Sequence, residues 1–283
     1  MKGRFAPSPT GVLHLGNLRT ALLAWLFARS AGSAFLLRIE DLDAGRVRPG
    51  FAEAQLEDLR ALGLDWDGEV VRQSARTSLY AEALERLPVY ECFCTRAEVS
   101  EAASAAHGPV GAYPGTCRGL SEAERAARRA AGRVPALRVA ADGPVVTFVD
   151  RVLGEQSGFV DDFVVRRNDG AFAYNLAVVV DDAAQGVEEV VRGADLVDST
   201  PRQIWLGRAL GAADLSYAHV PLVLGADGRR LAKRHGDVTL REVAPDAALA
   251  WMAASLGLSG SSPRELLAGF DPAQVSREPT TYP

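Results

Sequence analysis

The most distinctive chemistry in the sequence lies near its start, where a histidine follows a loop rich in proline and glycine. The loop runs from Pro7 to Gly11, and His14, Gly16 and Asn17 follow where a helix is expected to begin. We expect free backbone N–H groups at this helix end, and these attract anions. An imidazole there can donate a hydrogen bond to a phosphoryl oxygen as charge develops, and a glycine lets a phosphate or purine approach the backbone. The simpler alternative is a helix cap with an incidental histidine.

A basic loop in the last quarter of the chain could also meet phosphates. It runs from Gly225 to Asp237 and contains Arg230, Lys233 and Arg234. A flexible ammonium group can follow phosphate oxygens as pyrophosphate departs, and such catalysis needs positioning and charge stabilisation without a protein nucleophile. The alternative interpretation is a solvated basic turn, which is the usual fate of a run of charges.

All three cysteines of the chain, Cys92, Cys94 and Cys117, lie within 26 positions of one another. In a reducing compartment this grouping favours a metal site over a disulfide. Zinc takes four nitrogen, sulfur or oxygen ligands, so three thiolates leave one ligand to find. His107 and Tyr113 are the candidates within the segment, and imidazole is the commoner ligand of the two. Buried structural cysteines without a metal remain the alternative.

Regular elements must hold these residues in place. A helical pattern is followed by a buried strand and then by an acidic turn, Glu40 to Asp43. This alternation predicts a parallel α/β sheet. The expected helices of this part cover residues 15–31, 50–63 and 74–87, and the expected strand covers residues 34–39.

The middle of the chain departs from this rhythm. Ser121 followed by Glu124 forms a capping-box pattern and predicts a helix. Residues 136–165 alternate apolar and polar side chains, which predicts β-hairpins. The α/β rhythm then returns, with a helix that begins at Ser199 and has proline in its first turn. We therefore expect an α/β domain with two insertions and a small helical tail, which includes residues 243–257.

These segments together resemble class I aminoacyl-tRNA synthetases. Residues 4–17 match the HIGH signature in the form that glutamyl and glutaminyl enzymes use, although Asn17 replaces its second histidine. Residues 230–234 resemble the KMSKS loop: its second lysine is present as Lys233, whereas other positions, including Ala232, depart from the consensus. The segments 38–43, 174–182 and 192–203 look like the corresponding parts of glutamyl-tRNA synthetases. The resemblance implies a Rossmann-type catalytic domain.

The resemblance also implies roles for individual residues. Two arginines and one carboxylate would complement the two carboxylates and the ammonium group of glutamate, because forked arginine–carboxylate contacts are strong and selective; which arginine meets which carboxylate stays open. A Cys-x-Cys…Tyr-x-x-x-Cys pattern occurs in zinc-binding glutamyl-type enzymes and favours Tyr113 over His107. The implied catalytic and ATP-binding residues are His14, Gly16, Asn17 and Lys233; the glutamate-binding residues are Arg4, Phe5, Ala6, Pro7, Ser8, Glu40, Tyr174 and Arg192; the structural zinc ligands are Cys92, Cys94, Tyr113 and Cys117.

Only 50 residues follow Lys233, too few for the anticodon-binding domain of a full-length glutamyl-tRNA synthetase. The chain therefore looks like the truncated glutamyl-Q tRNA(Asp) synthetases. That family implies activation of glutamate with ATP and Mg²⁺ without tRNA, followed by transfer to the queuosine base of tRNA(Asp). The alternatives are a ligase that charges a tRNA 3′ end or another acceptor, a nucleotidyltransferase that uses no amino acid, and a non-catalytic RNA-binding module.

We expect four segments on this basis: the first half of the Rossmann domain over residues 1–90, a zinc-binding insertion over 91–135, an acceptor-type insertion with the second Rossmann half over 136–225, and the KMSKS-like loop with a helical appendage over 226–283. The longest apolar stretch, residues 21–28, is too short to span a membrane, and no signal-peptide core follows the first charges. We expect a cytoplasmic monomer with a net charge of −5, which argues against broad nonspecific binding of nucleic acid.

Composition draws attention to one residue. The chain has 31 basic residues, and only Lys2 and Lys233 among them are lysines. Arginine can replace lysine where a solvated cation suffices, but a planar guanidinium fork does not reproduce a compact ammonium charge. An internal lysine in so arginine-rich a chain therefore marks Lys233 as a candidate functional residue.

Overall fold

The computed structural model describes residues 1–95, 97–100, 112–229, 231 and 238–283. The predictions that concern His107, Arg230, Ala232, Lys233 and Arg234 therefore lie outside the described residues.

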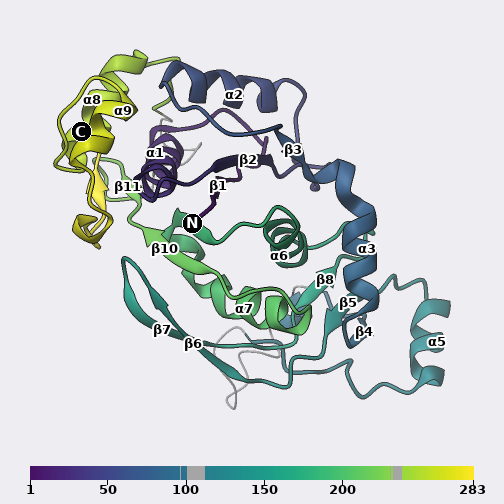
Figure 1. Ribbon diagram of the computed structural model, residues 1–283. Coiled ribbons are helices and arrows are strands. Elements are labelled where there is room, and N and C mark those ends of the chain that lie inside the picture. Colours follow the sequence, from purple (N-terminus) through teal and green to yellow (C-terminus); the bar gives the residue numbers. More distant parts are fainter. Residues whose placement is uncertain (96, 101–111, 230, 232–237) are drawn as a thin grey trace.

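A seven-stranded sheet forms the centre of the protein, in the order β3-β2-β1-β9-β10-β6-β7 (Figure 1). All neighbouring strands are parallel except the β6–β7 pair. The order of the first five is that of a doubly wound nucleotide-binding sheet, in which the strand order reverses beside the first strand. The strands are β1 Gly3–Phe5, β2 Phe35–Ile39, β3 Val71–Arg72, β6 Val145–Asp150, β7 Gly154–Phe159, β9 Glu189–Gly193 and β10 Ser216–Val220.

Helices cover both faces of this sheet because successive strand residues point to opposite sides. In β9, Val191 joins the apolar cluster that contains helix α1, whereas Val190 joins the cluster of α3, α6 and α7. Figure 1 shows α1 on one side of the sheet and α6 and α7 on the other. The helices of these two layers are α1 Leu15–Ser30, α2 Phe51–Ala61, α3 Thr77–Glu85, α6 Tyr174–Ala184 and α7 Thr200–Ala209.

The helices expected over residues 15–31, 50–63 and 74–87 correspond to α1, α2 and α3, and the expected strand corresponds to β2. The capping box is confirmed, because the Ser121 side chain accepts from the Glu124 backbone and Glu124 accepts from the Ser121 backbone. It begins helix α5, which spans Glu122–Ala130.

The hairpin prediction for residues 136–165 is confirmed for β6 and β7, which pair directly in antiparallel fashion. The outer two strands of that stretch pair instead in a separate three-stranded antiparallel sheet, in the order β4-β5-β8. The hairpin between them reaches across to β10 of the main sheet. These strands are β4 Val89–Cys92, β5 Ala136–Val139 and β8 Val164–Arg166.

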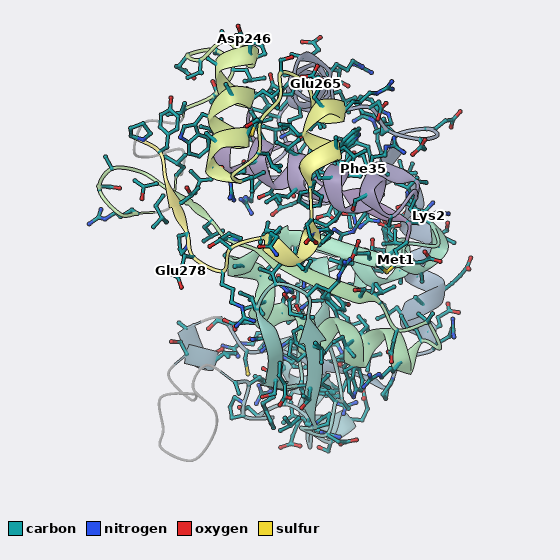
Figure 2. The ribbon with its side chains drawn as sticks, turned by 60° about the vertical axis from the view of Figure 1, so that its left-hand side comes forward. Met1, Lys2, Phe35, Asp246, Glu265 and Glu278 are labelled. Carbon is teal, nitrogen blue, oxygen red and sulfur yellow. The ribbon has the colours of Figure 1, made fainter. Side chains whose placement is uncertain are left out.

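The C-terminal segment packs against the first helix. Figure 2 marks α8 and α9 by Asp246 and Glu265, and both helices lie beside α1. Met252 and Leu266 are fully buried in the apolar cluster of α1. None of the helices in the described ranges has the length and apolar character needed to cross a bilayer. This part of the chain contains α8 Pro245–Ser255, α9 Pro263–Gly269, and the paired strands β11 Val223–Leu224 and β12 Thr280–Thr281.

Candidate active site and metal centre

A cavity of about 850 Å³ opens where β1 and β9 end, at the reversal of strand order. Doubly wound sheets bind ligands at this position, and the volume lies near the upper end of the range of roughly 300–1,000 Å³ for small-molecule sites. The structure brings every described residue of the expected ATP and glutamate sites to this cavity: Arg4, Phe5, Ala6, Pro7, Ser8, His14, Gly16, Asn17, Glu40, Tyr174 and Arg192.

His14 is the N-cap of α1, and a hydrogen bond to its ring shows which ring nitrogen carries the proton. The Nδ1 atom accepts a hydrogen bond from the backbone N–H of Asn17 at 3.2 Å. A neutral imidazole that accepts at Nδ1 carries its proton on Nε2. His14 therefore lines the cavity as a hydrogen-bond donor through Nε2.

The expectation of free N–H groups at the start of α1 is wrong for two of them. The Leu15 N–H donates to the carbonyl oxygen of Val238 at 2.8 Å, and the Asn17 N–H is taken by His14. Helix ends satisfy such groups with side chains or with other backbone segments. The positive end of the helix remains, and His14 supplies the directional donor there.

The missing side chain of Gly16 protects the position of His14. A Cβ atom built on Gly16 would lie 3.1 Å from both Cε1 and Nδ1 of the His14 ring, and 3.4 Å from the Cβ of Val223. Contacts this short force the ring to move by a few tenths of an ångström. The glycine is therefore required by the close approach of the imidazole.

We expect Gly16→Ala to reduce catalysis without reducing stability. Alanine favours a helix over glycine by about 0.5–1 kcal/mol, whereas displacing a catalytic donor by a fraction of an ångström is expected to slow the reaction by roughly tenfold. Thermal unfolding and steady-state kinetics of glutamate-dependent ATP–pyrophosphate exchange check this. Gly32→Ala, at a position with open space around it but a positive φ of 62°, is the control for changes in stability alone. Wild-type rates in Gly16→Ala would contradict the assignment.

Arg4 is already paired with a carboxylate. Its Nε and Nη2 donate to the two oxygens of Asp182, each at 3.2 Å, and Arg38 donates to the same carboxylate at 2.8 Å. Burial works against ionisation of Asp182, but the two arginines outweigh it and hold its pKa below the usual range. Burial raises the pKa of Glu40, and Arg38 and Arg4 offset only part of that effect. A substrate ammonium group beside Glu40 would favour its ionised form.

Arg192 differs, because all its partners are neutral. It donates to Gln203 Oε1 at 2.7 Å, to Thr200 Oγ1 at 2.8 Å, to His219 Nε2 at 3.1 Å and to Tyr174 Oη at 3.2 Å. Its longer contacts, at 3.4 Å, go to Leu196 O and Ser199 Oγ. Within the described ranges Arg192 forms no ion pair, although the residue is only 5% exposed. A buried cation without a counter-ion favours an anionic ligand.

Several supporting residues have no role in the sequence analysis. Arg38 and Asp182 lie inside the segments that resemble glutamyl enzymes, and their charges within apolar runs are the signal that could have found them. Gln55 gives no such signal: its Nε2 donates to Ser8 O at 3.1 Å and to Gly11 O at 2.6 Å. This buried amide thereby fixes the loop that leads into α1.

The three cysteine thiols gather at the edge of the small sheet. Their Sγ atoms all lie within 4.8 Å of one another. The Tyr113 hydroxyl lies 3.4 Å from Cys92 Sγ and 3.8 Å from Cys94 Sγ, and Cys94 Sγ lies 3.5 Å from Cys117 Sγ. The structure thus brings together the four predicted ligands, and the three thiols could hold a metal ion.

Cations and burial control the charge of this cluster. The Arg138 guanidinium donates to Cys92 Sγ at 3.2 Å and lies 3.7 Å above the Tyr113 ring. Burial raises the pKa of the Cys94 thiol to about 12. Burial also opposes ionisation of Cys117, but hydrogen bonds, first from the Phe93 backbone, lower its pKa below the usual value. A bound dication would favour the thiolate form of all three cysteines.

The cysteine cluster is connected by hydrogen bonds to α7, the helix whose side chains contact Arg192. The Tyr113 backbone N–H donates to Asp161 Oδ2 at 2.9 Å, and Arg202 Nε donates to Asp161 Oδ1 at 2.7 Å. Arg202 belongs to α7, as do Thr200 and Gln203, which contact Arg192. The cysteine cluster and the cavity therefore share α7 as a structural support.

Comparisons with known proteins agree with this geometry. A 61% identical relative from Nocardia farcinica covers 98% of this chain and 91% of its own length, and a 50% identical one from Symbiobacterium thermophilum covers 99% and 95%; both are called Glutamyl-Q tRNA(Asp) synthetase. Two solved structures cover 100% of this chain. One is a glutamate tRNA ligase from Elizabethkingia meningosepticum in complex with its amino acid (TM-score 0.82, 28% identity, 67% of that chain), and the other is a glutamate-tRNA synthetase from Elizabethkingia anophelis (TM-score 0.84, 29% identity, 68% of that chain).

The family model for the catalytic domain of class I tRNA synthetases (E and Q) matches residues 1–278, nearly the whole chain. This match and the match to the 61% identical relative both extend over nearly the whole sequence. The cavity at the reversal of strand order lies where such a fold binds its ligands. The chain therefore belongs to the class I tRNA synthetases of the E and Q type and is an enzyme of that family.

Proposed function

We propose that the protein activates glutamate with ATP to form glutamyl-adenylate, without tRNA, and transfers the glutamyl group to the queuosine base of tRNA(Asp). The observation that carries the proposal is that one cavity contains both Arg192, a buried cation without a counter-ion among its partners, and His14, a hydrogen-bond donor at a helix N-terminus. Relatives with up to 61% identity and the name Glutamyl-Q tRNA(Asp) synthetase support the choice of amino acid and acceptor.

Glutamate is expected to bind through its three charges. Arg192 lacks a counter-ion among its partners and would receive one carboxylate, exchanging its longest contacts for it. Arg4 uses Nε and Nη2 on Asp182 and would offer its remaining nitrogen, Nη1. Glu40 would receive the ammonium group. The Tyr174 hydroxyl accepts from Arg192 and so keeps its own proton for donation to substrate.

In the activation step a carboxylate oxygen of glutamate attacks the α-phosphorus of ATP. A new P–O bond forms, the bond between the α-phosphorus and the bridging oxygen breaks, and pyrophosphate leaves with its electron pair. His14 would stabilise the charge on the α-phosphoryl oxygens through Nε2–H, with help from the positive end of α1. Mg²⁺ bound with ATP would neutralise part of the phosphate charge.

Lys233 is proposed to hold the departing pyrophosphate. It lies outside the described residues, but the residues that flank its segment reach the site. Leu231 lines the cavity, and its backbone N–H donates to Val223 at 3.1 Å. On the other side, Val238 accepts from the first residue of α1, Leu15. Both flanks of residues 232–237 are therefore anchored at the start of α1 or at the cavity wall.

In the transfer step a hydroxyl of the queuosine cyclopentenediol attacks the carbonyl carbon of the adenylate. An ester forms, the hydroxyl loses its proton, and AMP leaves. A second candidate is the charging of a tRNA 3′ end, because the similar solved structures are called glutamate tRNA ligase and glutamate-tRNA synthetase.

One experiment separates the two acceptors. The protein is incubated with ATP, radiolabelled glutamate and tRNA(Asp) that either contains or lacks queuosine. We expect label only on the queuosine-containing tRNA, in a ribonuclease fragment from the anticodon loop. Equal label on unmodified tRNA, removed together with the 3′-terminal adenosine, would refute the queuosine acceptor and support the second candidate. Absence of glutamate-dependent ATP–pyrophosphate exchange would refute the adenylation step itself.

We also propose that residues 91–135 form a zinc-binding insertion between the segments 1–90 and 136–225. Zn–S bonds of about 2.3 Å place two sulfur ligands of a tetrahedron about 3.8 Å apart, and a Zn–O bond of about 2.0 Å places the oxygen about 3.5 Å from each sulfur. The Tyr113 hydroxyl, at 3.4 Å from Cys92 Sγ and 3.8 Å from Cys94 Sγ, and the Cys94–Cys117 pair, at 3.5 Å, suit this geometry. Four protein ligands would make the zinc structural. Three free thiols also suit a reducing compartment such as the cytoplasm.

Removal of one ligand is expected to release the metal. We expect about one equivalent of zinc in the purified protein and less than about half an equivalent in Cys117→Ser, with a lower melting temperature, because structural zinc sites contribute folding free energy directly. Elemental analysis and thermal unfolding measure both effects. Tyr90→Phe is the control, since Tyr90 is buried in the same cluster but donates to Asp162 at 2.7 Å.

The fourth ligand is decided by a matched pair of variants. Tyr113→Phe should weaken zinc binding in competition with a chromogenic chelator, whereas His107→Ala should leave it unchanged. The reverse result would assign the site to His107, and a wild-type protein without zinc would refute the metal centre.

A further inference from the structure

Two buried residues outside both signature motifs form a chain of hydrogen bonds that ends at the guanidinium of Arg192. His219 lies on β10 directly beside Arg192 on β9, in the register of the parallel pair. Asp150 ends β6, on the other side of β10. The side chains of His219 and Asp150 are completely buried. Neither residue lines the cavity, so neither can contact a substrate there directly.

The hydrogen bonds fix one tautomer of the His219 ring. Arg192 Nε lies 3.1 Å from His219 Nε2. Since an arginine N–H can only donate, Nε2 must be the acceptor and carry no proton. The ring proton then lies on Nδ1, which is 2.6 Å from Asp150 Oδ2 and donates to it.

The orientation of Asp150 is equally constrained. Its Oδ1 accepts the backbone N–H groups of Val152 and Leu153, both at 2.9 Å, and the backbone N–H of His219 is shared between Oδ1 and Oδ2, at 3.1 Å from each. The bonds from Val152 and Leu153 go to Oδ1 alone, so Oδ2 is the oxygen that faces the His219 ring. Burial alone would raise the pKa of Asp150, but its hydrogen bonds, first that with His219, hold the pKa below the usual value. The carboxylate stays ionised and keeps the ring proton on Nδ1.

We propose that His219 and Asp150 are positioning residues that hold Arg192 for a substrate carboxylate while leaving its positive charge uncompensated. The inference rests on the proposed function, because it takes Arg192 as the carboxylate-binding residue. The contrast with Arg4 carries it: Asp182 contacts that arginine directly and neutralises it. At Arg192 a neutral imidazole stands between the guanidinium and the nearest carboxylate of the network, so the cation is oriented but not paired.

Three variants test the anchor. Asp150→Asn keeps the shape, but its oxygen must stay with the backbone N–H groups of Val152 and Leu153, so its amide N–H faces His219 Nδ1. The ring proton then moves to Nε2, where it points at the Arg192 N–H and prevents the hydrogen bond. A buried aspartate that orients a histidine is known to have this effect on the tautomer when it is replaced by asparagine. His219→Phe keeps a ring without an acceptor. His219→Gln restores an acceptor oxygen at a similar depth.

The measurement is steady-state ATP–pyrophosphate exchange. We expect Asp150→Asn and His219→Phe to raise the KM for glutamate by roughly tenfold to a hundredfold, with the KM for ATP within about twofold of wild type and a smaller effect in His219→Gln. Glu189→Gln is the matched control: it neutralises a buried carboxylate at the start of β9, away from the cavity. It should leave both KM values unchanged. Unchanged glutamate KM in Asp150→Asn and His219→Phe, or equal losses for both substrates, would overturn the inference.

A second measurement needs no activity. The ¹⁵N shifts of the His219 ring, assigned with the His219→Phe variant, should show a protonated Nδ1 and a bare Nε2 in the wild type and the reverse in Asp150→Asn. A wild-type ring protonated on Nε2 would overturn the anchor even if exchange is normal. A wild type that shows no glutamate-dependent exchange would instead refute the proposed function, and the ring shifts would still decide whether the anchor exists.

Discussion

Replacement of Arg192 by leucine is expected to lower kcat/KM for glutamate in ATP–pyrophosphate exchange by about a thousandfold. A buried ion pair that loses one partner costs roughly 3–5 kcal/mol, because the other charge stays buried and unpaired. In the leucine variant that unpaired charge would be the substrate carboxylate. The free protein loses only neutral contacts, to groups such as Gln203, Thr200 and His219, so its fold should survive.

Two further variants make the result specific. Arg192→Lys keeps the charge but loses the fork, and we expect it to recover only part of the activity. Arg4→Leu should differ in kind: it strips Asp182 of one of its two arginines and should lower the melting temperature as well as activity. Exchange in Arg192→Leu within threefold of wild type would remove Arg192 from the glutamate site, and the proposed mode of recognition with it.

Local signals in the sequence were sufficient for most of the fold. The apolar pattern of residues 15–31 and the capping box at Ser121 depend on neighbours within one or two helical turns, and α1 and α5 form where these patterns predict them. The partners of β5 and β8 could not be predicted in this way. Both belong to a sheet with β4, whose residues lie far away in the sequence, and the β6–β7 hairpin between them bonds elsewhere.

The candidate site shows the same division. The ATP-binding and glutamate-binding residues could be predicted because the HIGH-like motif and the family resemblance name them. Those that the structure describes all line the cavity. The state of each group could not be predicted. Arg4 and Arg192 look alike in sequence, yet one is neutralised by Asp182 and the other is held by neutral groups. Likewise, the N–H of Leu15 is occupied by Val238, a partner from the far end of the chain.

The second large effect is expected at Lys233. Lys233→Ala should remove most of the ATP–pyrophosphate exchange, by about a hundredfold to a thousandfold in kcat, since loss of one donor to a developing charge has an effect of that size. The melting temperature should change little. The flanks on either side of residues 232–237 are held by backbone hydrogen bonds of Leu231 and Val238, which the substitution does not touch.

The composition of the chain supplies a matched control and a second test. Lys2 is the other lysine, and its Nζ donates to Gln185 O at 3.1 Å, away from the cavity, so Lys2→Ala should retain wild-type exchange. In that variant Lys233 is the only lysine side chain. A phosphate-directed aldehyde such as pyridoxal phosphate, fixed by borohydride, should then label the peptide that contains Lys233, and ATP should protect it. A lysine in contact with the departing phosphates must be shielded by bound ATP and must be needed when pyrophosphate leaves. Full exchange in Lys233→Ala, or labelling that ATP does not reduce, would therefore show that other residues hold the pyrophosphate.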